Sequence, residues 1–151
     1  MHMRGEPRTM QSDVAYNDLM GEIGEFLAAQ VAVARSAGCN ADQLVIDPGI
    51  GFGKSAEQNL ELLGRIEELA STAYPVLVGP SRKSFIGLTL DLPVEDRLEA
   101  TIAACLAAFE GGAELFRVHD VAAARRALDM ADAIRRAARG GRMNDQRGNR
   151  Y

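Results

Sequence analysis

Apolar residues recur at helical spacing in four stretches of the sequence, where they would form one continuous face of a helix. In the first stretch, Leu19, Ile23 and Leu27 fall on one side. Gly38 follows at a position typical of a helix C-terminus. Asp120 directly precedes the fourth stretch, so its side-chain oxygen is predicted to cap that helix. The pattern predicts helices over residues 13–37, 57–71, 94–110 and 121–139.

Three short apolar runs lie between these helices, and each leads into a polar or glycine-containing loop. Runs of this length that contain β-branched residues are typical of buried strands. They predict strands at residues 44–46, 76–78 and 115–118. Strands and helices therefore alternate at intervals that suit repeated strand–helix units.

This alternation predicts an α/β fold that is part of a parallel (β/α) barrel. A complete barrel needs about 250 residues, whereas the sequence has 151. The three strands, with the remnant of an earlier strand near Met3, correspond to about the second half of the eight units. We therefore predict one barrel domain over residues 1–139. The segment 140–151 is rich in Gly, Arg and Asn and is predicted to be a disordered tail.

The composition is typical of a globular protein, with 47% hydrophobic and 25% charged residues. The formal net charge of -4 gives no electrostatic reason to expect a nucleic-acid partner. No apolar run approaches the length of a membrane span, and the N-terminal region lacks the apolar core of a signal peptide. Cys39 and Cys105 lie in alanine-rich surroundings and are predicted to be reduced thiols of a cytoplasmic protein.

The loop after the first predicted strand combines one carboxylate with several glycines. Asp47 ends the apolar run, and Pro48 has no N–H to donate to a central strand. Gly49, Gly51 and Gly53 permit sharp turns or the close approach of a ligand. Parallel α/β enzymes place ligand contacts at such strand ends. The segment is therefore either a ligand-binding loop or a tight turn with a solvated Asp47.

The loops after the other two strands carry positive charge. Lys83 follows the second strand, beside Arg82. Arg117 and His119 alternate at the end of the third strand, so both side chains should point the same way. Beside a helix N-terminus, these groups suit a phosphate or pyrophosphate. The alternative for each residue taken alone is a solvated lysine, a solvated histidine and an arginine in a surface ion pair.

A flat heterocycle would suit the space between these loops. The carboxylate of Asp47 can accept two N–H bonds from a guanidine-like ring, and Lys83 can donate to a ring carbonyl or nitrogen. Met3 and Phe52 are suited either to sandwich such a ring or to fill the core. The sequence shows no spacing typical of metal ligands and no Ser-His-Asp or Cys-His pattern.

Four segments, in their order along the chain, resemble the motifs of the dihydropteroate synthases. The segments are Met1-His2-Met3-Arg4-Gly5 with Pro7 and Thr9-Met10-Gln11; Asp47-Pro48-Gly49-Ile50-Gly51-Phe52-Gly53-Lys54 with Asn59, Leu62 and Leu63; Gly79 with Ser81-Arg82-Lys83-Ser84; and Arg117-Val118-His119-Asp120-Val121. The resemblance covers residues 1 to about 136. The chain is similar to the C-terminal half of this pterin-binding family, whose fold is a TIM barrel.

The resemblance implies a transferase of folate biosynthesis, from a family that is a target of sulfonamides. Its reaction condenses 6-hydroxymethyl-7,8-dihydropterin pyrophosphate with p-aminobenzoate, which gives 7,8-dihydropteroate and pyrophosphate. By resemblance, Asp47 and Lys83 bind the pterin, while Arg117 and His119 bind the pyrophosphate. Lys83, Arg117 and His119 are the predicted catalytic residues, because the reaction mainly requires stabilisation of the leaving charge. The other predicted substrate-binding residues are Ser84 and Phe52 on the p-aminobenzoate side, Met3 and Gly79 in the pterin pocket wall, and Gly51 and Val118.

The sequence also departs from the family. The part that corresponds to the family's first half is absent from the sequence. That part includes the metal-binding Asn, two mobile substrate loops and part of the pterin pocket. The resemblance implies a magnesium cofactor whose protein ligand lies in that missing half, so no metal ligand is predicted in this chain. The isolated chain is therefore expected to be inactive or weakly active. A homodimer that forms through the C-terminal helices is also implied.

Two alternatives belong to other classes of protein. The first is a non-catalytic half-barrel that binds a pterin or an anion, or that assembles with a partner half through exposed strand edges. The second is a related pterin-dependent methyltransferase. Segments 81–84 and 117–119 favour the synthase, because a methyl transfer has no pyrophosphate to hold.

Overall fold

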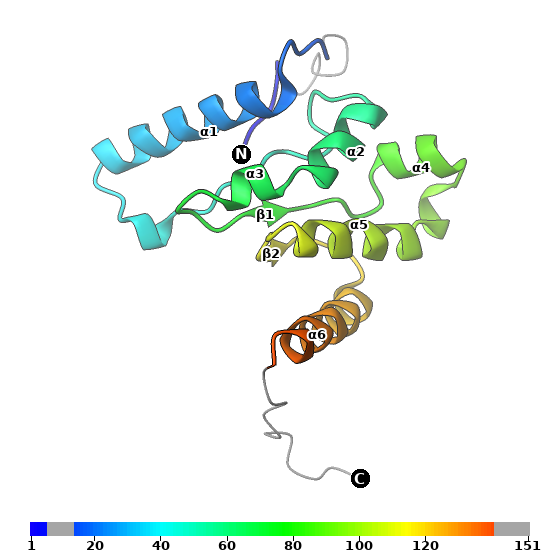
Figure 1. Ribbon diagram of the computed structural model, residues 1–151. Helices are drawn as coiled ribbons and strands as arrows, with labels where there is room; N and C mark the ends of the chain where they lie inside the picture. The colour runs from blue at the N-terminus through cyan, green and yellow to red at the C-terminus, as the bar shows by residue number, and fades with distance from the viewer. Residues whose placement is uncertain (6–13, 141–151) are drawn as a thin grey trace.

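The computed structural model describes residues 1–5 and 14–140 and shows an α/β arrangement in which short parallel strands lie among helices (Figure 1). Strand β1 (Leu77–Val78) pairs in parallel with β2 (Leu115–Phe116). Just before β1, Val76 forms a parallel bridge with Ile46. Of the predicted strand 44–46, this bridge is the only part that pairs within the described residues. The parallel α/β order is confirmed.

The carboxyl ends of these strand segments meet on one side of the molecule. Asp47 directly follows the bridge residue Ile46, Gly79 follows β1, and Arg117 follows β2. The N-terminal segment joins the same row, because the N–H of His2 donates to the carbonyl oxygen of Asp47 at 2.8 Å. The prediction that the three polar loops share one face is confirmed.

Helices alternate with the strand segments along the described parts of the chain. The α-helices are α1 (Leu19–Ser36), α2 (Ala56–Gly64), α3 (Glu67–Ala70), α4 (Ser84–Leu90), α5 (Leu98–Glu110) and α6 (Val121–Ala138). Two short 3-10 helices, η1 (Ala41–Gln43) and η2 (Val94–Asp96), lead into the 44–46 run and into α5. Three of the four predicted helices are confirmed as α1, α5 and α6, with α1 and α5 starting later than predicted. Helix α1 begins at Leu19 because the side chain of Asp18 accepts from the N–H of Gly21 at 3.1 Å.

The predicted single helix 57–71 is wrong, because the chain breaks between α2 and α3. Gly64 ends α2, and Arg65 leaves the helical conformation with φ -116° and ψ 20°. Glycine weakens a helix interior. The break also lets Ile66 turn fully into the core, where only 1% of its surface is exposed.

Helix α4 differs from the sequence prediction, which has a polar loop after the second strand. Phe85 and Ile86 in its first turn are both buried, and each exposes 3% of its surface. A helix of seven residues is too short to show a repeating apolar stripe. The burial of these two adjacent side chains against the rest of the protein therefore stabilises α4.

The predicted cap of the last helix is also wrong. Asp120 occupies the N-cap position of α6, but its side chain makes no capping hydrogen bond. Both carboxylate oxygens accept instead from the guanidinium of Arg82, at 2.8–3.1 Å. An ion pair with a neighbouring loop has replaced the local cap.

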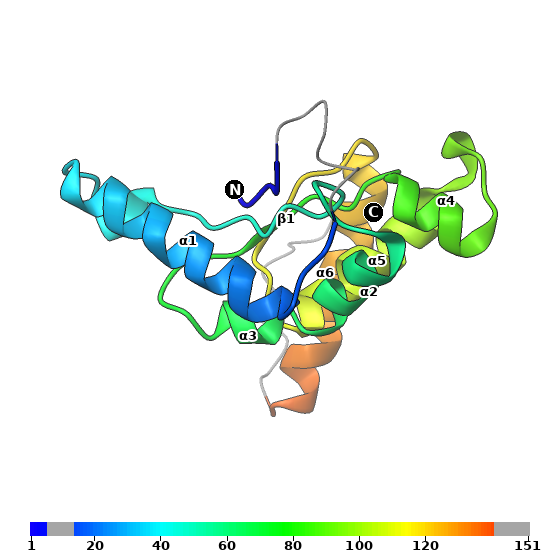
Figure 2. The same cartoon turned by 90° about the horizontal axis from the view of Figure 1, so that it is seen from above.

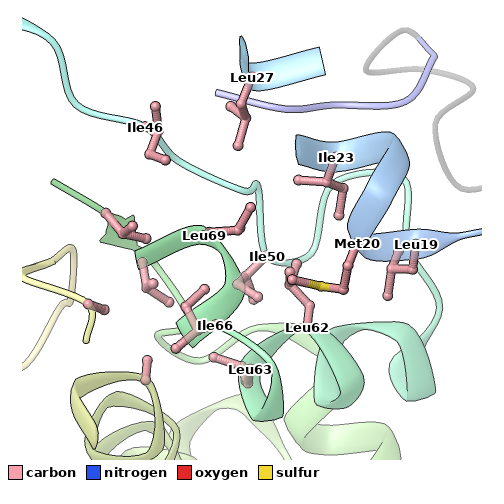
Figure 3. Close-up of a cluster of buried hydrophobic side chains, with 14 of the residues drawn as sticks. Leu19, Met20, Ile23, Leu27, Ile46, Ile50, Leu62, Leu63, Ile66 and Leu69 are labelled. Atoms are coloured by element: carbon pink, nitrogen blue, oxygen red, sulfur yellow. The ribbon is translucent and has the colours of Figure 1, made fainter. Parts of the chain in front are cut away.

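The core lies between α1, α2, α3 and the strand segments, as the close-up shows (Figure 3). Ile23 of α1 and Leu62 of α2 are fully buried within it. Helix α6 lies apart from this cluster and packs against α5 (Figures 1 and 2). Its only buried residue is Ala124, so α6 contributes little to the core of the described chain.

Some predictions fall on residues outside the described ranges. These are the motif residues Pro7 and Thr9 to Gln11, and the tail from residue 141 onwards. Among residues 1–5 and 14–140, no helix combines the length and the apolar character needed to cross a membrane.

Truncation of Leu62 to alanine should lower the free energy of unfolding by about 2–5 kcal/mol, because it leaves a cavity in the core. The matched change Leu88→Ala, at a side chain that is 75% exposed, should alter it by less than about 0.5 kcal/mol. Urea denaturation followed by circular dichroism measures both values. Equal losses for the two variants would contradict this description of the core.

Candidate functional site

A turn of three glycines follows Asp47 at the strand end. One carboxylate oxygen of Asp47 accepts from the N–H of Gly49 at 2.8 Å, which closes the start of the turn. Gly49 and Gly51 have φ values of +72° and +76°, a region that favours glycine. A Cβ on Gly49 would lie 1.9 Å from the carbonyl oxygen of His2. The turn therefore packs against the N-terminal segment so closely that no side chain fits.

A buried lysine closes the far end of this turn. Lys54 exposes only 2% of its surface, and its Nζ lies 3.0 Å from the carbonyl oxygen of Gly49 and 3.1 Å from that of Phe52. Its third partner is Nδ1 of His2, at 3.0 Å. Asn59 adds a further hydrogen bond to the turn, because its Oδ1 accepts from the N–H of Gly51 at 2.6 Å. Lys54, Asn59 and His2 are not among the site residues that the sequence predicts.

The protonation states of Lys54 and His2 are complementary. Burial lowers the pKa of Lys54 to about 8, and the negative charge of Asp47 opposes this shift. Burial, with the nearby charge of Lys54 as the next cause, lowers the pKa of His2 to about 4. Near neutral pH, Lys54 is therefore an ammonium with three hydrogens to donate. His2 is neutral, and its Nδ1 accepts one of them.

Lys83 reaches across the turn from the next strand. Its Nζ donates to the carbonyl oxygen of Ile50 and lies 3.9 Å from the centre of the Phe52 ring. A Cβ on Gly51 would lie 2.6 Å from Cδ of Lys83, so the missing side chain makes room for the lysine. The alternative of a solvated loop lysine is wrong. Phe52 is predicted either to sandwich a flat ring or to fill the core, and in the structure its ring contacts the Lys83 ammonium.

Burial lowers the pKa of Lys83 to about 8, with the positive charge of Arg117 as the second cause. Asp47 acts in the opposite direction. Lys83, Arg117 and Asp47 therefore form one electrostatically coupled group at the ends of three strand segments.

Arg117 extends over the strand ends toward Asp47. The two side chains approach to 4.0 Å, with the arginine side chain 61% exposed and the carboxylate 14% exposed. A Cβ on Gly79 would lie 3.2 Å from Nε of Arg117, so Gly79 leaves space for the arginine stem. A distance of 4.0 Å is too long for a hydrogen bond. Both groups therefore keep most of their hydrogen-bonding capacity toward the open side.

His119 contacts the loop that follows β1. Its Nδ1 lies 2.9 Å from Oγ of Ser81, and its backbone N–H donates to the same oxygen at 3.2 Å. Arg82 follows Ser81, and Asp120 follows His119. These two residues form an ion pair. Two adjacent contacts therefore fasten the loop after β1 to the segment after β2.

The remaining predicted residues lie around this centre or away from it. Met3 is half-buried in the N-terminal segment, and Ser84 is exposed at the start of α4. Val118 lines an open hollow of about 540 Å³ between β2 and α6, away from Asp47 and Lys83. The structure thus brings together Asp47, Gly51, Phe52, Gly79, Lys83 and Arg117, with His119 beside them.

The described residues do not offer a metal site. Nowhere in the described ranges do three or more His, Cys, Asp or Glu side chains gather so that they could hold an ion. The donors around Asp47 are two cations and backbone amides, which do not suit a divalent metal.

Parallel strand ends that carry a partly buried carboxylate and two coupled cations indicate an enzyme-like site for a polar, anionic ligand. A model of the pterin binding enzyme family matches residues 1–119, so the chain belongs to this family. The chain is similar to the dihydropteroate synthase of Synechocystis sp., at 50% identity over 135 residues, or 89% of this chain and 47% of the relative. The enzyme of Haemophilus influenzae is 45% identical over 123 residues, or 82% and 45% of the two chains. The chain spans about half the length of the curated relatives it matches.

Solved structures give the same comparison. Dihydropteroate synthase of Yersinia pestis, in a sulfonamide drug complex, is 38% identical and superposes with a TM-score of 0.87 over 90% of this chain and 50% of that chain. The enzyme of Thermus thermophilus is 43% identical, with a TM-score of 0.83 over 89% of this chain and 54% of that chain. The described fold is therefore similar to about half of the fold of these dihydropteroate synthases.

Lys54 and Lys83 are the only lysines in the sequence, so carbon-13 labelling at lysine Cε gives two titration curves. Both should titrate near pH 8 in the folded protein, and near about 10.4 in urea. Arg117→Ala should raise the pKa of Lys83 and leave that of Lys54 unchanged, because it removes a positive charge near Lys83 alone. Asp47→Asn should lower both values. If neither substitution changed the pKa of Lys83, these groups would not be electrostatically coupled.

Proposed function

We propose that the chain is the C-terminal half of a dihydropteroate synthase. In this proposal it supplies part of the site that condenses 6-hydroxymethyl-7,8-dihydropterin pyrophosphate with p-aminobenzoate. The observation that carries the proposal is the grouping of Asp47, Lys83 and Arg117 at adjacent parallel strand ends. The family match and the named relatives support the same reaction.

Asp47 and Lys83 are the proposed pterin contacts. The carboxylate of Asp47 has one oxygen bonded to Gly49, and the other lies no closer than 4.0 Å to Arg117. A carboxylate in this position can accept N–H bonds from the pterin amino group and ring. With a pKa of about 8, Lys83 is mostly charged near neutral pH and can donate to the pterin. Its contact with the Phe52 ring supports a position of the ammonium beside the p-aminobenzoate side, to which we also assign Ser84.

Arg117 and His119 are the proposed pyrophosphate ligands. In the reaction, the bond between the pterin methylene carbon and the pyrophosphate oxygen breaks, and the oxygen keeps the electron pair. The amine nitrogen of p-aminobenzoate then bonds to the electron-poor methylene carbon and loses a proton. Cations held at the leaving group stabilise the developing charge, so the residues contribute mainly by electrostatic preorganisation. The Thermus thermophilus enzyme has been solved in complex with 6HMPPP, which supports this class of ligand.

The half-barrel architecture is part of the proposal. The edge of β2 is free of further strands among the described residues, and Leu115 on it is 40% exposed beside the open hollow. At the other edge of the row, Met1 and Val45 are 51% and 46% exposed. Apolar side chains at both edges are suited to pack against the other half of a barrel.

Further properties of the whole enzyme are proposed on the resemblance alone. These are a magnesium requirement with ligands outside the described residues, a cytoplasmic location, and competition of sulfonamides with p-aminobenzoate. A homodimer through the C-terminal helices is supported by the exposed side chains of Val121, Met130 and Ile134 on α6. Non-catalytic assembly of two halves remains the second candidate, because the exposed edges favour it. A methyltransferase is less well supported, since the curated relatives at 39–50% identity are named dihydropteroate synthases.

Arg117→Ala should weaken pyrophosphate binding by roughly tenfold or more, because it removes a charge-assisted donor. Asp47→Asn should leave binding unchanged or slightly improve it, because it removes a nearby negative charge and keeps an oxygen that can accept from Gly49. Calorimetric titration of pyrophosphate into the wild type and both variants measures this. Equal losses in the two variants would contradict separate pterin and anion subsites.

Fusion of the N-terminal half of the Synechocystis relative ahead of Met1 should give magnesium-dependent formation of dihydropteroate. The 151-residue chain alone should be slower by orders of magnitude, because absent positioning groups have effects of that size. The matched control is the same fusion with Arg117→Ala, which should lose most of the activity. Robust turnover by the chain alone would overturn the proposed division of the site.

A further inference from the structure

The hydroxyl of Ser81 has a defined set of partners. Ser81 exposes 6% of its surface, in the loop that follows β1. Its Oγ accepts from the backbone N–H of His119 at 3.2 Å and lies 2.9 Å from Nδ1 of the same residue. One lone pair is therefore used by the backbone, and the single hydroxyl hydrogen has Nδ1 as its acceptor. If Nδ1 carried the hydrogen instead, this buried hydroxyl would have no acceptor among the described residues, which is unfavourable.

We propose that Ser81 is a positioning residue that orients the His119 imidazole and keeps its hydrogen on Nε2. His119 is an exposed residue, so its Nε2–H is then the donor that it offers to an anion beside Arg117. This inference rests on the proposed pyrophosphate site and assigns the hydrogen-bond donor within it.

The neighbouring residue pair supports the same arrangement. Asp120 directly follows His119, where a free carboxylate would repel an anion and compete for the imidazole N–H. The guanidinium of Arg82 binds both oxygens of Asp120 at 2.8–3.1 Å, which neutralises this charge. Arg82 itself has a φ of +57°, and its backbone N–H donates to Oγ1 of the buried Thr101 at 3.0 Å. Ser81 thus binds His119, and Arg82 binds the adjacent Asp120. In this arrangement the His119 Nε2–H remains the donor for an anion.

A purely structural tie between the two loops is the competing explanation. It would require the Ser81 hydroxyl for folding but not for the direction of the imidazole donor. The two explanations differ in the tautomer of His119 and in how Ser81 and His119 depend on each other.

Nitrogen-15 labelling of histidine tests the tautomer without any ligand. The sequence contains two histidines, His2 and His119, and His119→Gln assigns their signals. We expect the neutral His119 to carry its hydrogen on Nε2 in the wild type, and Ser81→Ala to increase the Nδ1–H form. The signals of His2 should not change, since its Nδ1 partner is Lys54. A wild-type His119 protonated on Nδ1, or a tautomer that is insensitive to Ser81→Ala, would overturn the proposal.

A double-mutant cycle with pyrophosphate tests the consequence for binding. Ser81→Ala should weaken binding roughly three- to tenfold in the wild type, the size expected for one neutral hydrogen bond. In the His119→Gln variant the amide supplies a donor that Ser81 does not orient. In that variant, Ser81→Ala should therefore change the pyrophosphate affinity by less than about twofold. Equal losses in both backgrounds would show a purely structural role and overturn the proposal. Absence of pyrophosphate binding by the folded wild type would instead contradict the proposed function, while the histidine spectra still decide the role of Ser81.

Discussion

The site depends on one buried positive charge. The ammonium of Lys54 binds the carbonyl oxygens of Gly49 and Phe52 and the imidazole of His2, and these three groups belong to the two ends of a turn and to the N-terminal segment. An ammonium can satisfy three acceptors at once, whereas no neutral side chain offers three hydrogens from one atom. The turn that presents the Ile50 carbonyl and the Phe52 ring to Lys83 is held in shape by this charge.

A second constraint is the balance of charge above that turn. Two lysines and Arg117 surround a single carboxylate, Asp47, which affects the pKa of both lysines. The positive charges repel one another, so a group that brings negative charge to these strand ends would relieve the repulsion. Strain and repulsion of this kind are expected where structure serves binding rather than stability. In the neighbouring ion pair of Arg82 and Asp120, by contrast, the two opposite charges cancel each other.

The parallel order of the strands and the common side of Asp47, Gly79 and Arg117 could be predicted from the sequence, because apolar runs and the loops after them are local patterns. Lys54 could not be predicted, because lysine is normally exposed and its partners are backbone carbonyls and a histidine that lies far away in the sequence. The contact between Ser81 and His119 is equally non-local. The break between α2 and α3 depends on how Ile66 packs, which no periodic pattern in one helix reveals.

The absence of a side chain at Gly51 has a consequence for how this protein can vary. The position that a Cβ would take is already close to the stem of Lys83, so any other residue there would displace the lysine from the Ile50 carbonyl and the Phe52 ring. A substitution on one loop would thus act on the reactive group of another. A substitution at Gly51 therefore cannot change this turn without also shifting Lys83.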